Sequence, residues 1–203
     1  MVFRCHGQAS PISAGKTIMT LKDRKREKVH SRKIEIATYT DDAGQVIVEG
    51  VLHDHCPITR YLMTGETRAP GTIHELVIRM AVAGPQLTIS DIEVEMPAVP
   101  RQECRQAVDC LDPLIGMPIE SGFTVQVKQT VGGPRGCAHL VSLLLAMAPA
   151  AVQGTWSAVS RKPMDPSVYA EQALDFLTDT CLVWAKNGPL EKQYREKLKA
   201  LKK

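Results

Sequence analysis

Two pairs of alternating segments constrain the fold more than any other feature of the sequence. The first pair covers residues 33–40 and 45–55, joined by the stretch DDAG. The second pair covers residues 73–82 and 87–96, joined by the stretch AGPQ. Alternating apolar and polar residues around a short glycine-containing turn are typical of β-hairpins. We therefore expect four antiparallel strands that share one buried face.

Two further features refine this sheet. The apolar phase slips between Ile89 and Ile92, which predicts a β-bulge near Ser90 and Asp91. Residues 121–131 alternate in the same way and are predicted to form a fifth strand.

The remaining apolar segments predict helices. Residues 138–153 are apolar nearly all round, which predicts a helix buried in the core. Pro149 should kink this helix or end its first half. Further helices are predicted at 101–111, at about 167–186 and at 190–203, and a loop with at most one helical turn is predicted at 56–72. The predicted fold class is α+β, with an antiparallel sheet of about five strands packed on a buried helix and with C-terminal helices.

Charge and composition divide the chain into three parts. Residues 1–30 are polar, basic and without an apolar period, so we expect a mobile basic N-terminal arm. We expect residues 31–186 to form a single α+β domain and residues 187–203 a basic C-terminal helix or tail. The net charge is +3, yet the body between the ends is acidic. The basic ends either bind an anionic partner or are solvated and pair partly with the body.

Cysteine usage and composition limit the partners. The six cysteines include no CxxC pair, and we see neither a signal peptide nor a transmembrane stretch. We therefore expect free thiols, a cytoplasmic location and no membrane partner. Aromatic residues make up only 4%, which argues against a nucleic acid bound by base stacking. The expected partner is a small anionic molecule, and a homo-oligomer is left open.

The glycine-rich turn at residues 132–136 leads into the apolar helix. Gly133 and Gly136 allow unusual backbone conformations and a close approach of a ligand. If Cys137 is the N-cap, the free amides and the helix dipole favour an anion or a thiolate there. Arg135 would then hold the anionic part of a substrate. The alternative is an ordinary tight turn with a small capping residue.

The spacing of Cys137 and His139 also matters. Residues two apart on a regular helix point about 200° away from each other. A nucleophilic Cys137 should therefore find its base elsewhere in the fold. If both residues lie in irregular backbone, they can instead bind one metal ion.

Three residues of the two hairpins are candidate partners. His74 falls on the apolar face of its strand, where it is either a general base or a core histidine whose hydrogen bonds are satisfied. Asp54 shares the apolar face of its strand and must find an imidazole, an arginine or backbone amides there, because an unpaired buried carboxylate is costly. Arg79 falls on the opposite face of the same strand. It either binds an anion or forms half of a solvated salt bridge.

A metal site is an alternative. His53 and His55 share one face of a strand, and Cys56, Cys137 and His139 are the candidates for further zinc ligands. The sequence completes no ligand set, so we assign no metal ligands and leave the cofactor open.

The chain resembles a bacterial family known as domain of unknown function 2889, over about residues 30–153. The resemblance rests on HSRKIEIATYTDDAGQVIVEGVLHD, IHELVIRMAV, the region of Cys104 and Leu114-Ile115-Gly116, and GGPRGCAHLVSLL. The family motif is G-x-x-G-C-T-H-L, in which Ala138 replaces threonine here. The family typically has Thr-Lys where this chain has His55-Cys56, so a histidine metal pair is not a family property. The resemblance implies motif positions but no activity: Asp54, His74, Arg79, Cys137 and His139.

These observations lead to four functional hypotheses. The first is an enzyme that acts on an acyl, ester, lactone or thioester group, with Cys137 as nucleophile or donor, His74 or His139 as base, and Asp54 orienting the imidazole. The second is a metal-dependent hydrolase with His and Cys ligands. The third is a non-catalytic module that binds a small anion at the glycine turn. The fourth is a nucleic-acid partner that uses the basic ends.

Overall fold

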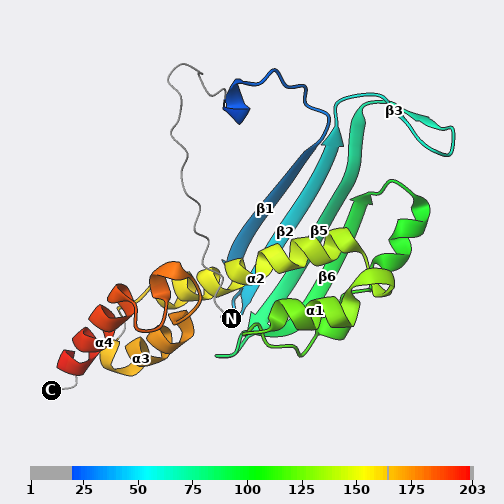
Figure 1. Cartoon of the computed structure of the whole chain (residues 1–203). Helices are drawn as coiled ribbons and strands as arrows, with labels where there is room; N and C mark the ends of the chain where they lie inside the picture. The colour runs from blue at the N-terminus through cyan, green and yellow to red at the C-terminus, as the bar shows by residue number, and fades with distance from the viewer. Residues whose placement is uncertain (1–19, 164, 202–203) are drawn as a thin grey trace, which may run out of the picture.

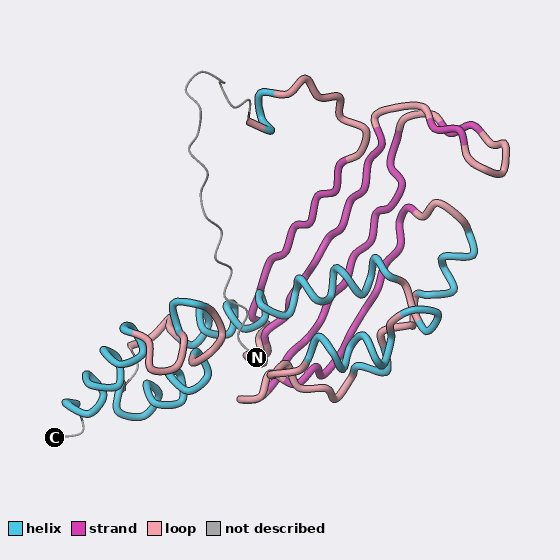
Figure 2. Tube along the Cα trace, in the orientation of Figure 1, coloured by secondary structure: helices cyan, strands magenta, loops and turns pink. Residues whose placement is uncertain are grey.

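A four-stranded antiparallel sheet forms the centre of the molecule (Figures 1 and 2). The structure is a computed structural model that describes residues 20–163 and 165–201. The sheet has the order β1-β2-β5-β6. Its strands follow a short 3₁₀ turn and have these bounds: β1 (Ser31–Thr40), β2 (Val46–Cys56), β5 (Gly71–Ala83) and β6 (Thr88–Ala98). The α+β class and the four strands of the two predicted hairpins are therefore confirmed.

Alternation along the two central strands builds the core. Every second residue of β2, from Val46 to Cys56, is buried, and the residues between them are half-buried. The neighbouring strand β5 continues this face with a run of fully buried side chains. The central core residues of the two strands are Val48, Leu52, Leu76, Ile78 and Met80. One face of the sheet is thus apolar, as the alternation in the sequence predicts.

The sheet contains the predicted bulge and two irregularities that the sequence does not predict, one of them between Glu75 and Val77 of β5, where it pairs with β6. In the pairing of β5 with β6, Ala81 faces Asp91 and Val82 faces Ile89, so Ser90 is the extra residue. A second irregularity lies between β2 and β5, where Asp54 faces His74 but His55 faces Thr72. A bulge of this kind redirects the side chains at the end of a strand.

The predicted fifth strand is wrong, because residues Phe123–Val131 form helix α1. The buried side chains Phe123, Val127 and Val131 recur every four residues, whereas Val125 is exposed. The β-branched residues of this segment alternate as in a strand, but Phe123, Val127 and Val131 also have the spacing of one helix face. The glycine turn that follows therefore joins two helices and not a strand to a helix.

The connections differ from prediction in detail. Residues 56–72 contain a second small sheet made of β3 (Arg60–Tyr61) and β4 (Thr67–Arg68) in place of a helical turn. The helix predicted at 101–111 is a 3₁₀ helix, η2 (Gln102–Ala107), and a further one, η3 (Asp112–Leu114), follows.

Helix α2 (Ala138–Val159) lies on the apolar face of the sheet, beside α1 (Figure 1). It contacts β2 most extensively and then β1 and β5. The helix was expected to be buried nearly all round, but only one face is buried, and Ser142 and Pro149 are exposed. Pro149 lies inside the helix and does not end it.

Helix α2 is long and apolar, although no membrane-spanning stretch was expected from the sequence. Within the described residues it is the one helix long and apolar enough to cross a membrane, with a mean hydropathy of 1.4. Its buried face packs on the sheet, which gives this apolarity a role in the core.

The C-terminal residues form helices α3 (Pro166–Leu177) and α4 (Pro189–Leu201) beyond the end of α2 (Figure 1). α3 ends well before the predicted residue 186, and a 3₁₀ turn, η5 (Leu182–Trp184), follows it. α4 packs against α3, and Trp184 contacts the ring of Tyr194 edge-on. Most of the expected N-terminal arm, residues 1–19, lies outside the described residues.

Gly50 allows α2 to lie close to the sheet, and this generates a prediction. A Cβ atom at Gly50 would lie 2.6 Å from the Sδ atom and 2.8 Å from the Cγ atom of Met147, which is fully buried. We expect Gly50→Ala to lower the free energy of unfolding by about 1–3 kcal/mol, because the core has no room for a methyl group. Urea denaturation measures this effect.

Met147→Ala provides the matched control. It removes the side chain that the new methyl group would meet, so the double variant should lose less stability than the sum of the single variants. Strict additivity would contradict the close packing of β2 on α2.

Candidate functional site

The site is built around Asp54, a buried carboxylate near the end of β2. The register places Arg32 of β1 directly opposite Asp54 on one side and His74 of β5 directly opposite on the other. Arg32 donates from Nε and Nη2 to the two carboxylate oxygens, at 2.7 Å each. His74 Nδ1 lies 3.0 Å from Oδ2. Asp54 is only 2% exposed, so three adjacent strands meet at one ionised group.

Arg32 sets the charge state of Asp54. Its hydrogen bonds lower the pKa of the Asp54 carboxyl below its ordinary value, against the opposing effect of burial, and His74 adds to the lowering. The hydrogen bond to Asp54 in turn raises the pKa of Arg32. A second imidazole approaches the carboxylate, since the Nε2 atom of His30 lies 3.6 Å from Oδ1. Asp54 is therefore an anion at neutral pH and accepts the Nδ1 proton of His74.

His139 joins the site from the first turn of α2. Its ring lies on that of His74, with 3.9 Å between the centroids and 33° between the planes. Burial lowers the pKa of His139, and the charges of His74 and Arg32 lower it further. The imidazole of His139 is therefore neutral at neutral pH and has a free nitrogen lone pair that can accept a proton.

Cys137 is the N-cap of α2 and lies beside His139. Its backbone is extended, with φ of −100° and ψ of 122°, so the 200° separation expected on a regular helix does not apply. The Sγ atom lies 3.9 Å from Nδ1 of His139. Cys137 does not cap the helix with its side chain, and the first intrahelical bond runs from the Val141 amide to the Cys137 carbonyl. The earlier amides of this turn have no intrahelical acceptor.

A second thiol lies behind the turn. The Sγ atom of Cys110 lies next to Gly136 and accepts a hydrogen bond from the backbone amide of Cys137. Burial raises the pKa of the Cys110 thiol above its ordinary value. Cys110 is therefore a protonated packing residue at neutral pH, and it supports the backbone that holds Cys137.

Two of the three glycines of the turn, Gly133 and Gly136, have different physical roles. Gly133 has a φ of +62°, in the left-handed region that favours glycine. Gly136 has an extended backbone, but a Cβ atom there would lie 2.5 Å from the carbonyl oxygen of Val131. Both glycines thus shape the connection between α1 and α2, which places the N-terminus of α2 at His74.

The two predicted anion-binding arginines do not join this cluster. Arg135 donates from Nε to the Thr130 carbonyl at 3.1 Å, and so satisfies the end of α1. Arg79 lies on the opposite face of the sheet, where its guanidinium pairs with Glu49 and Glu95. The strand register confirms that Arg79 and His74 lie on opposite faces of the sheet. The surroundings of Arg79 are those of a surface ion-pair network.

The residues that the sequence offers as candidate metal ligands beside Cys137 and His139 also lie apart from the cluster. His53 and His55 share one face, with 6.4 Å between their ring centroids, and His53 Nε2 contacts the Thr72 hydroxyl at 3.0 Å. Cys56 is buried and its thiol contacts two backbone carbonyls. Within the described residues, the group that could hold a metal ion consists of Asp54, His74 and His139, whose ligand atoms all lie within 4.8 Å of one another.

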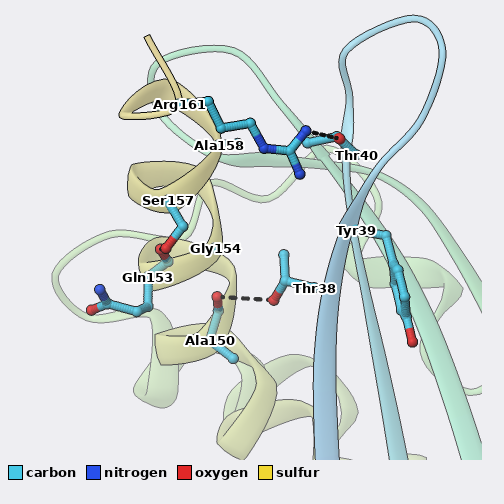
Figure 3. A pocket seen from close by; sticks show the side chains of 9 residues that line it. All are labelled: Thr38, Tyr39, Thr40, Ala150, Gln153, Gly154, Ser157, Ala158 and Arg161. Carbon is cyan, nitrogen blue, oxygen red and sulfur yellow. Dashed lines mark hydrogen bonds between the residues drawn. The ribbon is translucent and has the colours of Figure 1, made fainter. Parts of the chain in front are cut away.

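The groove between β1 and the second half of α2 lies at the other end of the helix (Figure 3). It has a volume of about 370 Å³, and among the described residues that line it only Arg161 is charged. Thr38 donates to the Ala150 carbonyl at 3.4 Å, and Arg161 donates to Thr40 at 3.3 Å. These bonds tie the helix to the edge strand, and the chemically reactive groups lie at the Cys137 end.

Comparison with known proteins places the chain in a family. Residues 30–153 match the family described as Protein of unknown function (DUF2889). The chain belongs to this family. No curated protein and no solved structure matches the chain. The DUF2889 segment contains the complete cluster from His30 to His139, whereas α3 and α4 lie outside it.

Sequence reasoning missed Arg32 and His30. A signal for Arg32 was present, because a hairpin that turns at residues 41–44 with Thr40 facing Val46 also makes Arg32 face Asp54. His30 has no comparable signal, since it precedes the first strand and approaches Asp54 only through the path of the chain.

The pairing of Arg32 with Asp54 generates a prediction. We expect Arg32→Gln to lower the free energy of unfolding at pH 7 by about 2–4 kcal/mol, because it leaves a buried carboxylate with only histidine partners. The lowered pKa of Asp54 stabilises the fold above about pH 4, and this contribution is lost as the pH falls below that value. The difference between the variant and the natural protein should therefore shrink as urea unfolding is repeated at decreasing pH.

Arg79→Gln is the matched control, because it removes the same charge from an exposed ion-pair network. It should cost less than about 1 kcal/mol. Equal losses in the two variants, at every pH, would contradict a special role for the Asp54 pair.

Proposed function

We propose that this DUF2889 protein is an enzyme that acts on an acyl, ester, lactone or thioester group, with Cys137 as its nucleophile. The observation that carries the proposal is the 3.9 Å contact between the Cys137 thiol and Nδ1 of a neutral His139, at the N-terminus of a 22-residue helix. A thiol next to a base, where free amides can meet a developing negative charge, is the arrangement that acyl transfer requires.

Each step of the proposed reaction has a group to perform it. His139 takes the proton of Cys137, and the sulfur attacks the carbonyl carbon of the substrate. The first-turn amides of α2 are placed to donate to the oxyanion that forms. When the carbonyl reforms, the C–O or C–S bond to the leaving group breaks, and His139 returns the proton to that group. Water then hydrolyses the acyl–cysteine, with His139 as general base.

Asp54 and His74 act in this proposal as positioning residues. Asp54 fixes the ring of His74 through Nδ1, and the ring of His74 in turn supports that of His139. The negative charge of Asp54 also favours the imidazolium that His139 becomes during the reaction, whereas Arg32 opposes it. Burial, together with the charges of His74 and Arg32, lowers the pKa of His139 and keeps it neutral between turnovers. The proposal includes the cytoplasmic location expected from the sequence, because a reducing compartment keeps a free thiol reduced.

The reactivity of Cys137 provides the first test. We expect iodoacetamide at neutral pH to alkylate Cys137 faster than the exposed Cys181, and p-nitrophenyl acetate to acetylate Cys137, because His139 removes its proton. His139→Ala should slow both reactions at Cys137 by about tenfold or more. Peptide mass spectrometry measures the rate at each site.

Cys181 is the internal control, because it is exposed and lies outside the site. Its alkylation should not change in His139→Ala. If Cys137 reacts no faster than Cys181 and never carries an acetyl group, the thiol mechanism fails. Ligand binding without any acylation would favour the non-catalytic anion-binding module.

A metal-dependent hydrolase is the second candidate, favoured by the proximity of Asp54, His74 and His139. Two observations weigh against this ligand set as it stands. Both oxygens of Asp54 are engaged by Arg32 and His74. Two imidazoles on one tetrahedral zinc, with bonds of about 2.0 Å, hold their centroids about 5 Å apart, compared with 3.9 Å here. Asp54 fits better as a carboxylate that orients a histidine than as a ligand.

Metal content distinguishes the two candidates. We expect protein purified without a histidine tag to contain less than about a tenth of an equivalent of zinc, iron or manganese, because the stacked rings would have to separate to bind an ion. Elemental analysis of the natural protein and of His74→Ala measures this content. Near-stoichiometric metal that is lost in His74→Ala would support the hydrolase and contradict the thiol mechanism.

A further inference from the structure

Three arginines line a cavity at the start of β5, the strand that also carries His74. The cavity has a volume of about 450 Å³, within the range of small-molecule pockets. Arg60 belongs to β3, Arg68 to β4, and Arg101 is the N-cap of η2. Thr72 and Ile73 also line the cavity, and the next residue of β5 is His74. The cavity therefore adjoins the strand that supports His139.

The positive charge of this cavity is largely uncompensated. Arg60 and Arg68 face each other directly in the register of the small sheet, and like charges at opposed positions destabilise a pair of strands. Glu66 neutralises Arg68 through an exposed contact of 2.7 Å. Within the described part of the chain, Arg60 and Arg101 form no ion pair, and no acidic residue lines the cavity. Two guanidinium charges are left without a counterion.

Arg60 has a hydrogen-bond donor that is not satisfied within the protein. Its Nε atom is buried and has no hydrogen-bond partner, and it is the one such side-chain atom among the described residues. A buried donor without an acceptor carries a desolvation cost. Two-residue strands are also too short to be stable by themselves. In the small sheet Arg60 faces Arg68 and its Nε atom lacks an acceptor, which an anionic ligand would supply.

We propose that Arg60, Arg68 and Arg101 bind a phosphate group of the substrate on which Cys137 acts. A phosphate monoester carries a charge of about −1.5 to −2 at neutral pH, which matches the two uncompensated arginines better than a single carboxylate does. The planar guanidinium fork also binds phosphate oxygens in pairs. This inference rests on the proposed function, and it narrows the substrate to acyl, ester, lactone or thioester compounds that also carry phosphate.

Inorganic pyrophosphate is the probe, titrated calorimetrically into the full chain at constant ionic strength. We expect saturable binding that Arg60→Gln and Arg101→Gln each weaken by about tenfold or more, because each removes charge-assisted hydrogen bonds. Citrate, a carboxylate of similar charge, should bind at least about tenfold more weakly. Hydrogen exchange of residues 60–68 should slow when pyrophosphate binds, because the small sheet gains the missing acceptor.

Two variants separate this inference from its alternatives. Arg161→Gln removes the same charge at the far end of the sheet and should bind pyrophosphate like the natural protein. Cys137→Ala should also bind it unchanged, so binding that persists while Cys137 proves unreactive overturns the proposed function alone. Absent binding, equal binding of citrate, or equal weakening by Arg161→Gln would each overturn the phosphate site.

Discussion

The ionised Asp54 is the interaction on which the rest of the site depends. It lies on the apolar face of β2, where an unpaired carboxylate would be strongly unfavourable. Arg32 and His74 solve this problem from the two neighbouring strands, so a single buried charge connects β1, β2 and β5. The same arrangement fixes the ring of His74 and gives His139 a surface on which to lie. The need to pair one carboxylate thus organises the histidines.

The position of α2 brings the second half of the site to the first. Gly50 leaves space for Met147, so the helix can lie close to β2. The glycine turn then begins α2 next to His74, with Cys137 at the N-cap. Because the N-cap residue has extended backbone, its thiol approaches the imidazole two residues later, which a helical residue could not do. Packing on the sheet and the end of the helix therefore determine the contact that the proposed chemistry uses.

Charge is distributed around the site in a way that suits its proposed substrate. Arg32 compensates Asp54, and Arg79 is paired with carboxylates on the opposite face. Arg60 and Arg101 lack such partners within the described residues and lie beside the first residues of β5. Arg79 and Arg135, which the sequence suggests for anion binding, are engaged within the protein. The sequence does not single out the arginines that line the cavity. Exposure to a cavity and lack of a counterion are properties of the folded chain.

The sequence by itself determined the two hairpins, the bulge at Ser90, the apolar helix after the glycine turn and the burial of Asp54 and His74. These follow from local alternation, turn chemistry and parity, which act over a few residues. The register of the first hairpin also implies that Arg32 faces Asp54. The sequence misassigned α1, because Phe123, Val127 and Val131 satisfy both the strand period and the helix period. Only the tertiary structure decided that His139 meets His74 and that Arg60, Arg68 and Arg101 line one cavity. Those contacts depend on how β5 pairs across a long connection and on where α2 packs, and no local pattern specifies either.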